Sequence, residues 1–296
     1  MKSKIAIAVV VLVAIIISIT VFIEKENEFF WEFVDQENDV YIGGTIHFMP
    51  ENTFPLSESI EQAFVESDVL FVEKDLLSID RESREFYDSQ HGYFSDGETL
   101  ADYISDELYH ETDVELEKVG IPIEGVDKLR PWYMAEMLEM SRVTELDYEL
   151  DDSVELYFMQ KAEEKGMEII ELESYFDYLD RLFETFTLEK QHLKATVKKD
   201  QLIEDRLYKV LEAWKNGDKD KMEDVVLAPR EEYPELEEYY QKLYDERNVE
   251  LTEKIIEVIE NREDEDVFVV LNAAHLVGEN GVLNILEEKG YELKQL

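Results

Sequence analysis

The sequence predicts an α/β domain whose central sheet contains two related strand–GxxH–helix units, with a large helical insertion and one N-terminal transmembrane helix. Short apolar runs alternate with segments of helical periodicity, as expected for strands joined by helical crossovers. One histidine-containing pattern occurs twice, near opposite ends of the series of apolar runs. An almost unbroken apolar stretch, residues 5–23, precedes the domain.

Residues 5–23 are expected to form a membrane anchor. Only Ser18 and Thr20 interrupt the apolar stretch, and as a helix it would be about 28 Å long, close to the roughly 30 Å hydrocarbon core of a bilayer. A cleavable signal peptide has a shorter apolar region that ends at small residues, whereas Phe22 and Ile23 end this one. We therefore expect an uncleaved anchor.

The charges around this stretch predict the orientation of the protein. Lys2 and Lys4 precede it, and an acidic domain follows it. By the positive-inside rule, residues 1–4 form a cytoplasmic tail and the domain at 29–296 lies outside the cytoplasm. The expected location is the cell membrane, with a single pass.

Composition limits the possible partners. The chain carries 73 acidic and 29 basic residues, a net charge of −44 that is spread along its length. Nucleic acid is excluded as a partner, because binding it requires phosphate neutralisation by lysine and arginine. The acidic surface is typical of proteins in high salt or in a cation-rich cell envelope. Since cysteine is absent, disulfides and thiolate metal sites are excluded as well.

The domain is expected to begin with a hairpin, a helix and a buried strand. Residues 29–45 hold two aromatic and aliphatic runs around a polar turn at 35–39. Residues 56–68 have helical spacing, with Ser57 as the N-cap candidate. Residues 69–76 form a short, strongly apolar run that predicts a buried strand.

The middle of the chain is predicted to be mainly helical. Residues 80–118 read as helices, and 131–143 read as a helix with Pro131 in its first turn. Between them, 120–129 is a third strand candidate that begins with glycine and proline. The amphipathic run 153–166 predicts a further helix that stops at a glycine.

The last part of the chain predicts the helical insertion and a second sheet unit. Residues 167–174 read as a strand, and 175–262 as the helical insertion. Residues 267–275 are expected to be the next strand, 281–290 a capped helix and 291–296 a short final strand.

Two histidines have matching sequence contexts. VYIGGTIHFMPEN around His47 and FVVLNAAHLVGEN around His275 both show an apolar strand, a small residue three positions before the histidine, and a Glu-Asn pair after it. Because α/β sheets bind ligands beyond the carboxyl ends of their strands, both imidazoles are expected at a binding site. Each is a candidate metal ligand or proton carrier; the alternative is a histidine satisfied by backbone hydrogen bonds. Glycine before the first histidine allows close approach or a positive φ.

A set of motifs along the chain carries a family resemblance. The motifs are YIGGTIHFMP, FVEKD, LRPWYMAEML, IIELES, ERN and NAAHLVGENGVLNILEEKGYEL. With them, the chain from about Phe29 to Leu296 resembles the TraB/GumN family, which includes the Tiki metalloproteases and bacterial pheromone-shutdown proteins. The resemblance implies metal-dependent proteolysis, with manganese or cobalt as the expected ion and zinc as a further option.

The resemblance implies a metal site of two histidines and one carboxylate. His47 and His275 end the two GxxH motifs, and Glu73 is the carboxylate within FVEKD. Glu73 also follows the apolar run VLFV, where an unpaired carboxylate would be costly to bury; the alternative is an ordinary surface glutamate. Three protein ligands would leave one coordination position open for water.

The resemblance also implies catalytic residues around the metal. Glu173, in IIELES, is the candidate general base or the carboxylate that orients a ligating histidine. Arg247 is expected to stabilise an oxyanion or to hold a substrate carboxylate, and Asn248 to donate beside it. The alternatives for these residues are a surface carboxylate, a salt bridge and a helix cap.

Gly44, Thr45 and Asn272 are the expected substrate-binding residues next to the histidines. Gly44 opens the first GxxH motif, and Asn272 stands where the second has glycine in the family. If that glycine is needed for the left-handed region, asparagine is the least damaging substitute. Glu155 stands at a position that is more often Asp in the family, which puts a role for it in doubt.

The other histidines and the tyrosine-rich segment are expected to have no part in the site. His91, His110 and His192 lie in polar contexts and read as surface residues. Residues 231–244 read as a packed helix face rather than as a ligand platform.

The predicted function is that of a membrane-anchored, divalent-metal-dependent peptidase or hydrolase acting on extracytoplasmic peptides or proteins. One alternative is a non-catalytic surface protein that binds and sequesters a peptide such as a pheromone, which Asn272 in place of glycine favours. A third reading, hydrolysis of a non-peptide ester, rests on a distant similarity to erythromycin-esterase-like folds.

Overall fold

The computed structural model describes most of the domain. The described residues are 28–35, 38–46, 49–50, 53–75, 77–78, 81–95, 97–145, 153–198, 203–262 and 264–296. The predicted cytoplasmic tail, the predicted anchor at 5–23 and His47 lie outside these residues. Within the described ranges, no helix combines the length and the apolar character needed to cross a bilayer.

Strands and helices alternate along the described chain, with most helices between the third and the fifth strand. In chain order the elements are β1 (Phe30–Asp35), β2 (Asn38–Thr45), α2 (Glu58–Glu66), β3 (Val69–Val72), α3 (Arg81–His91), α4 (Leu100–Tyr103), α5 (Asp106–Lys118), η1 (Ile123–Gly125), α6 (Pro131–Glu145), α7 (Val154–Lys165), β4 (Glu168–Glu171), α8 (Tyr175–Glu184), η2 (Phe186–Leu188), α9 (Glu189–Lys198), α10 (Ile203–Lys215), α11 (Lys219–Glu232), η4 (Pro234–Leu236), α12 (Glu237–Tyr240), η5 (Gln241–Glu246), α13 (Arg247–Glu260), β5 (Val267–Asn272), α14 (Ala273–Leu276), α15 (Val282–Glu288) and β6 (Lys294–Gln295).

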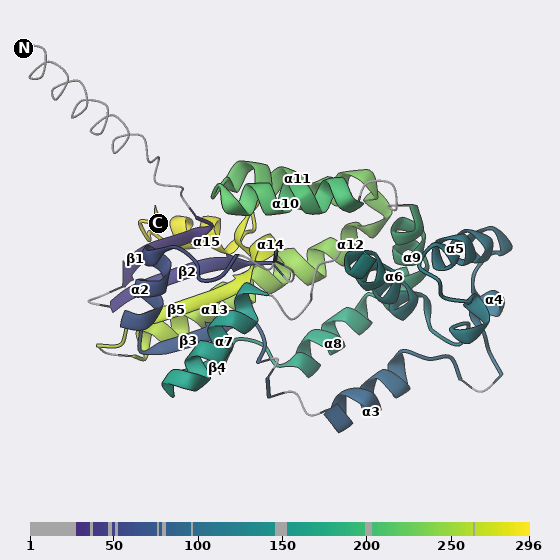
Figure 1. Cartoon of the computed structure of the whole chain (residues 1–296), viewed down its shortest axis with the longest axis horizontal. Helices are drawn as coiled ribbons and strands as arrows, with labels where there is room; N and C mark the ends of the chain where they lie inside the picture. Colours follow the sequence, from purple (N-terminus) through teal and green to yellow (C-terminus); the bar gives the residue numbers. More distant parts are fainter. Residues whose placement is uncertain are drawn as a thin grey trace, which may run out of the picture.

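A six-stranded sheet with the order β4-β3-β5-β2-β1-β6 forms the centre of the described domain (Figure 1). β4, β3, β5 and β2 are parallel, and β1 is antiparallel to both β2 and β6. The predicted α/β class is therefore confirmed. The predicted N-terminal hairpin is also confirmed, with a register from Phe30 opposite Gly43 to Asp35 opposite Asn38.

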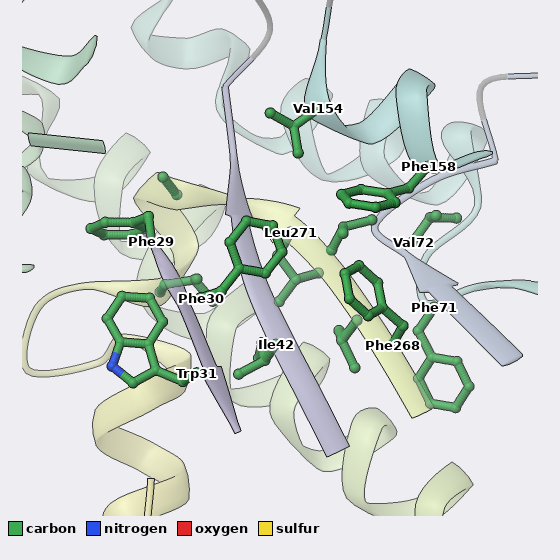
Figure 2. Packing of buried hydrophobic residues seen from close by; sticks show 14 of the residues in the cluster. Phe29, Phe30, Trp31, Ile42, Phe71, Val72, Val154, Phe158, Phe268 and Leu271 are labelled. Atoms are coloured by element: carbon green, nitrogen blue, oxygen red, sulfur yellow. The ribbon is translucent and has the colours of Figure 1, made fainter. Parts of the chain in front are cut away.

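Helices cover both faces of this sheet. On one face, the rings of Phe64 in α2 and Phe158 in α7 have centres 5.0 Å apart, and both contact Phe268 of β5 (Figure 2). α13 and α15 pack against each other on the other face. The handedness of the crossovers explains this division, since β2, β3 and β4 follow one direction across the sheet and the chain returns to β5 in the opposite direction.

The chain leaves the neighbouring strands β2 and β5 toward opposite faces of the sheet. After β2 it continues to α2, and after β5 it continues to α14 and α15. Parallel strands whose connections diverge in this way open a crevice at their carboxyl ends, where ligands bind in doubly wound sheets. β2 and β5 pair as far as Thr45 with Asn272, so the two matching sequence motifs leave adjacent strand ends.

Helices from two stretches of the chain form a second lobe, which faces the carboxyl ends of the parallel strands (Figure 1). α4, α5 and α6 precede β4, whereas α9 follows it. They share an apolar cluster of Leu100, Ile104, Leu108, Leu116, Ile123, Leu129, Met134, Ala135, Leu138, Leu193 and Val197. The helices of 175–262 thus pack with earlier helices, while the last of them, α13, belongs to the sheet.

The strand predicted at 120–129 is wrong. These residues contain the 3-10 turn Ile123–Gly125 instead. Gly120 has a φ of 73°, outside the range of a strand, and Pro122 has no N–H to donate to a ladder. Local backbone chemistry therefore overrides the apolar alternation.

Gly43 and Gly44 leave room for two aromatic rings. A Cβ at Gly43 would lie 1.9 Å from Cε1 of Phe30, and a Cβ at Gly44 would lie 2.4 Å from Cδ1 of Phe29. Neither glycine has a positive φ. Of the two reasons considered for glycine at this position, close approach is the one that applies.

Gly43→Ala is expected to lower the free energy of unfolding by about 1–3 kcal/mol, the usual cost of overpacking a dense core. Urea unfolding followed by circular dichroism measures this change. Gly125→Ala is the control, because a Cβ at Gly125 would have no neighbour within 4 Å. Equal stability of the two variants would contradict the packing argument.

Candidate active site

Three strand ends and two helices bring six of the predicted site residues together. From the ends of β3, β4 and β5 and from α13 and α14 come, in that order, Glu73, Glu173, Asn272, Arg247, Asn248 and His275. All of these except Asn272 are buried. The site therefore lies where the carboxyl edge of the sheet meets the helical lobe (Figure 1).

Arg247 lies at the centre of this group. Its Nε donates to Glu173 at 2.8 Å, and its Nη2 donates to Glu73 at 2.7 Å. Its Nη1 is 2.8 Å from Nε2 of His275. Burial works against the charged form, but Glu73 and Glu173 raise the pKa of Arg247 above its ordinary value. One guanidinium thus neutralises two buried carboxylates and also contacts the imidazole.

Hydrogen bonds fix the protonation state of His275. Its Nδ1 is 2.7 Å from Oδ1 of Asn248, which can only accept, so Nδ1 carries the proton. Its Nε2 faces the Arg247 guanidinium, which can only donate, so Nε2 accepts through its lone pair. The imidazole is therefore neutral, with its lone pair directed into the site. Ligating histidines are commonly held in this way by a partner on the other ring nitrogen.

Glu73 is ionised although it is buried. Burial alone would raise its pKa, but the charges of Lys74 and Arg247 hold the pKa well below its usual range. Its Oε1 accepts from both of these side chains. Its Oε2 accepts from the backbone N–H of Asn272 at 3.2 Å and lies 3.7 Å from Nε2 of His275. Glu73 thus joins the ends of β3 and β5.

Asn272 caps the short helix α14. Its Oδ1 accepts from the backbone N–H of Ala274 at 2.9 Å, and its φ is −54°. The left-handed conformation considered for this position is therefore wrong. Asparagine is instead suited to the position as an N-cap, for which it is among the preferred residues.

A cavity of about 120 Å³ lies over the site. Its lining residues come from both lobes: Glu73, Lys74, Tyr178, Tyr239, Leu243, Tyr244, Arg247, Asn272, Ala274 and His275. This volume corresponds to roughly four water molecules at about 30 Å³ each. In this conformation the cavity admits a small group rather than a peptide segment.

Tyrosines of the helical lobe form the outer wall of this cavity. The ring of Tyr244 is centred 5.4 Å from the ring of His275. The ring of Tyr178 lies 5.1 Å from the guanidinium carbon of Arg247 and 4.3 Å from Nζ of Lys74. Tyr244 belongs to the π-helical turn η5, a kind of turn that is frequent at functional sites.

Sequence reasoning missed this wall. Residues 231–244 do pack, but Tyr239 and Tyr244 also line the cavity, so their interpretation as a packed face alone is incomplete. The apolar spacing of a helix does not distinguish a tyrosine in a core from one in a cavity wall. Lys74 had a usable signal, since a lysine directly after a buried carboxylate is a natural counter-charge.

Gly44 and Thr45 are set apart from the cavity. The carbonyl oxygen of Gly44 accepts from Nε1 of Trp214 at 2.6 Å, and Thr45 is fully buried. Of the predicted substrate-binding residues, Asn272 is the one in the cavity lining. The position of His47 relative to His275 stays a prediction, because His47 lies outside the described residues.

The other histidines differ in exposure. His110 is exposed, as predicted. The prediction for His192 as a surface residue is wrong: it is buried, and its ring is stacked on Tyr239 with centres 4.9 Å apart. His91 is half-buried and stacks on Phe183. The polar sequence around His192 conceals that its helix, α9, packs against α6.

The donor chemistry of the site fits a divalent ion. Glu73 offers a carboxylate oxygen, and His275 an imidazole lone pair 3.7 Å away, which are donors that suit manganese, cobalt and zinc. Within the part of the chain that the structure describes, no group of three or more His, Cys, Asp or Glu side chains is arranged to hold an ion. A complete site therefore needs a further donor, and His47 is the predicted one.

Glu155, in the first turn of α7, is a second buried carboxyl group near Glu73. Burial and the charge of Glu73 raise the pKa of Glu155 to about 8, against the opposing effect of Lys74. Among the described residues, Oε1 of Glu155 has no hydrogen-bond partner. Glu155 therefore keeps its proton at neutral pH in the folded protein.

The raised pKa of Glu155 predicts a pH-dependent stability. The unfolded chain loses this proton near pH 4.5 and the folded chain near pH 8, so the folded state binds more protons between these values. The stabilisation is complete below about pH 4.5 and is lost as pH rises toward about 8. Glu155→Gln should therefore lose less stability than the wild type between pH 5.5 and pH 8.5 in urea unfolding.

Glu163→Gln is the control for this measurement, because Glu163 is an exposed carboxylate on the same helix. It should keep the pH dependence of the wild type. An identical pH dependence in the Glu155→Gln variant would show that this carboxyl group titrates normally.

Comparison with known proteins identifies one family. The model of the TraB/PrgY/gumN family matches residues 29–295, which is nearly the whole chain. No curated protein and no solved structure gives a match. The matched range includes every element of the sheet and all residues of the candidate site. The chain is therefore a member of the TraB/PrgY/gumN family.

Proposed function

We propose that this protein is a divalent-metal-dependent hydrolase that cleaves peptides or proteins outside the cytoplasm. The observation that carries the proposal is the pairing of Glu73 with His275 at the carboxyl edge of the sheet, with the two donor atoms 3.7 Å apart. Membership in the TraB/PrgY/gumN family supports it, because the resemblance implies metal-dependent proteolysis.

In this proposal His47, Glu73 and His275 hold the ion, which is manganese or cobalt, with zinc as a further option. The ion would supply Lewis-acid polarisation of the scissile carbonyl group. Asn248 keeps the lone pair of His275 directed into the site through the bond to Nδ1. The backbone N–H of Asn272 keeps Oε2 of Glu73 directed toward the imidazole.

The remaining charged residues neutralise and orient. Glu173 accepts from Nε of Arg247 at 2.8 Å and from Nε of Arg181 at 3.4 Å. Both contacts favour an orienting role for Glu173 over that of a general base, because a base needs a free lone pair directed at the reacting proton. The guanidinium of Arg247, in the cavity wall, is placed to attract an oxyanion or a substrate carboxylate.

The proposal predicts that metal content and peptide hydrolysis depend on the same residues. The full-length protein, prepared with Mn²⁺ or Co²⁺, should hold stoichiometric metal by elemental analysis and should cleave members of a peptide library. His47→Ala, His275→Ala and Glu73→Gln should lose the metal and lower kcat/KM by on the order of 100-fold or more.

His110→Ala is the matched control, because His110 is exposed on α5, in the helical lobe. It should keep both metal and activity, and circular dichroism should show that every variant is folded. A wild-type protein that holds no metal after exposure to Mn²⁺, Co²⁺ and Zn²⁺ would refute the proposal.

A peptide-binding protein without catalysis is the second candidate. Arg247 donates to Glu73 and contacts Nε2 of His275, so the fold satisfies both side chains without an ion. Single-turnover experiments with the peptide library separate the two functions. Tight binding without cleavage, unchanged by a chelator, would favour sequestration, whereas cleavage that a chelator abolishes would favour hydrolysis.

We also propose that residues 5–23 anchor the domain at the outer face of the cell membrane. The uninterrupted apolar character of this stretch supports the proposal. The full-length protein should stay in the membrane fraction after an alkaline carbonate wash, and external protease should reach its domain. Release by the wash, or protection from external protease, would contradict the anchor or its orientation, respectively.

A further inference from the structure

We propose that Arg247 is an internal competitor of the metal ion: its guanidinium occupies the ligating nitrogen of His275 in the metal-free protein and is displaced when a divalent cation binds. The inference concerns regulation of the site described above and rests on the proposed metal-dependent function. It assigns Arg247 a position in the metal-free state that differs from its position in the loaded state.

The lone pairs of His275 carry the first step of the argument. A neutral imidazole has one N–H and one lone pair. The N–H is at Nδ1, where it is held by Oδ1 of Asn248 at 2.7 Å. The lone pair at Nε2 accepts from Nη1 of Arg247 at 2.8 Å. The same lone pair cannot also bind a metal, so ligation by His275 requires that the contact with Arg247 breaks.

The charges of the site carry the second step. Two carboxylates, Glu73 and Glu173, are buried beside each other's partner, and a buried charge is strongly destabilising when it is left unpaired. Arg247 contacts both of them at 2.7 Å and 2.6 Å through Nη2. Without an ion, the guanidinium is the positive charge that lies between Glu73, Glu173 and the imidazole.

The far side of Arg247 shows where the displaced guanidinium is held. Glu173 contacts Nε as well as Nη2, so it retains Arg247 after the contact with His275 breaks. Arg247 also lines a second cavity of about 560 Å³, on the side of Glu173. The carboxylates of Asp177, Asp180, Glu184, Glu246 and Glu250 line this cavity too and offer acceptors for an arginine. Arg247 is thus the partition between the two cavities.

Displacement would couple metal binding to substrate binding. In the metal-free state, Arg247 contacts protein atoms through Nε, Nη1 and Nη2. Loading the ion frees Nη1, and with it a donor directed at the cavity over His275. The residue that stabilises the empty site would then be available to an oxyanion or a carboxylate of the substrate only when the ion is present.

The competition is tested by titrating the full-length, metal-free protein with Co²⁺ alone, using calorimetry and thermal unfolding. The variants are Arg247→Met, Arg247→Lys and Arg181→Met. Arg247→Lys keeps a positive charge between the two carboxylates and so should fold even where Arg247→Met does not. Arg181→Met is the control, because Arg181 contacts Glu173 but has no contact with His275. Binding of Co²⁺ to surface carboxylates is common to all variants.

The expected result is tighter binding with less intrinsic stability. The Kd of Co²⁺ should fall about tenfold or more in Arg247→Met, the change that corresponds to removal of one charge-assisted hydrogen bond, and by a smaller factor in Arg247→Lys. The metal-free Arg247→Met protein should unfold at a lower temperature than the wild type, and saturating Co²⁺ should raise its Tm more than that of the wild type. Arg181→Met should bind Co²⁺ like the wild type.

Three results would overturn the inference: an unchanged Kd in both Arg247 variants, weaker binding in both, or no specific Co²⁺ binding by any variant. Tightening of equal size in Arg181→Met would assign the effect to net charge alone and would overturn it as well. The proposed hydrolase fails separately. If the affinities follow the expected order and no peptide is cleaved, the competition stands and the hydrolytic function does not.

Discussion

The neutralisation of two buried carboxylates by one arginine is the interaction on which the candidate site depends. Glu73 and Glu173 lie at the ends of parallel strands, where water is excluded by the helical lobe. Charges in such a position are retained only when they are paired and hydrogen-bonded. Arg247, from the first turn of α13, meets both and reaches His275 as well. The geometry of α13, the π-helical turn before it and the sheet edge are linked through this one side chain.

The sheet follows from the sequence because its signals are local and consistent. Each apolar run from β3 to β5 is buried on both faces, so an unbroken hydrophobic run and a strand are the same statement. The hairpin is equally clear from two runs around a polar turn. The segment 120–129 has the same alternation, but its glycine and proline prevent a ladder. The packing of α9 against α6 depends on contacts between distant segments, and the helical pattern of one segment cannot report it.

The candidate site was predictable where its residues follow strands and not where they come from the helical lobe. Glu73, Glu173 and His275 follow β3, β4 and β5, and parallel strands bring their carboxyl ends to one edge. The central place of Arg247 was not predictable, since its partners are fixed by the packing of α13 under the sheet. The tyrosine wall was missed for the same reason. The glycines were correctly singled out, but their reason is the volume of two neighbouring phenylalanine rings.

The strand order has a kinetic consequence. β2 pairs with β5, and β1 pairs with β6, so the central sheet joins residues 30–45 to residues 267–295 across more than two hundred intervening positions. Pairings between such distant segments form slowly, because the loop-closure entropy is lost before the contacts are gained. While the chain is being made, its early hairpin waits with an open edge at β2. The arginine and histidine that complete the charged cluster arrive with the same late segment that closes this edge, so chemical competence and structural closure are acquired in one step.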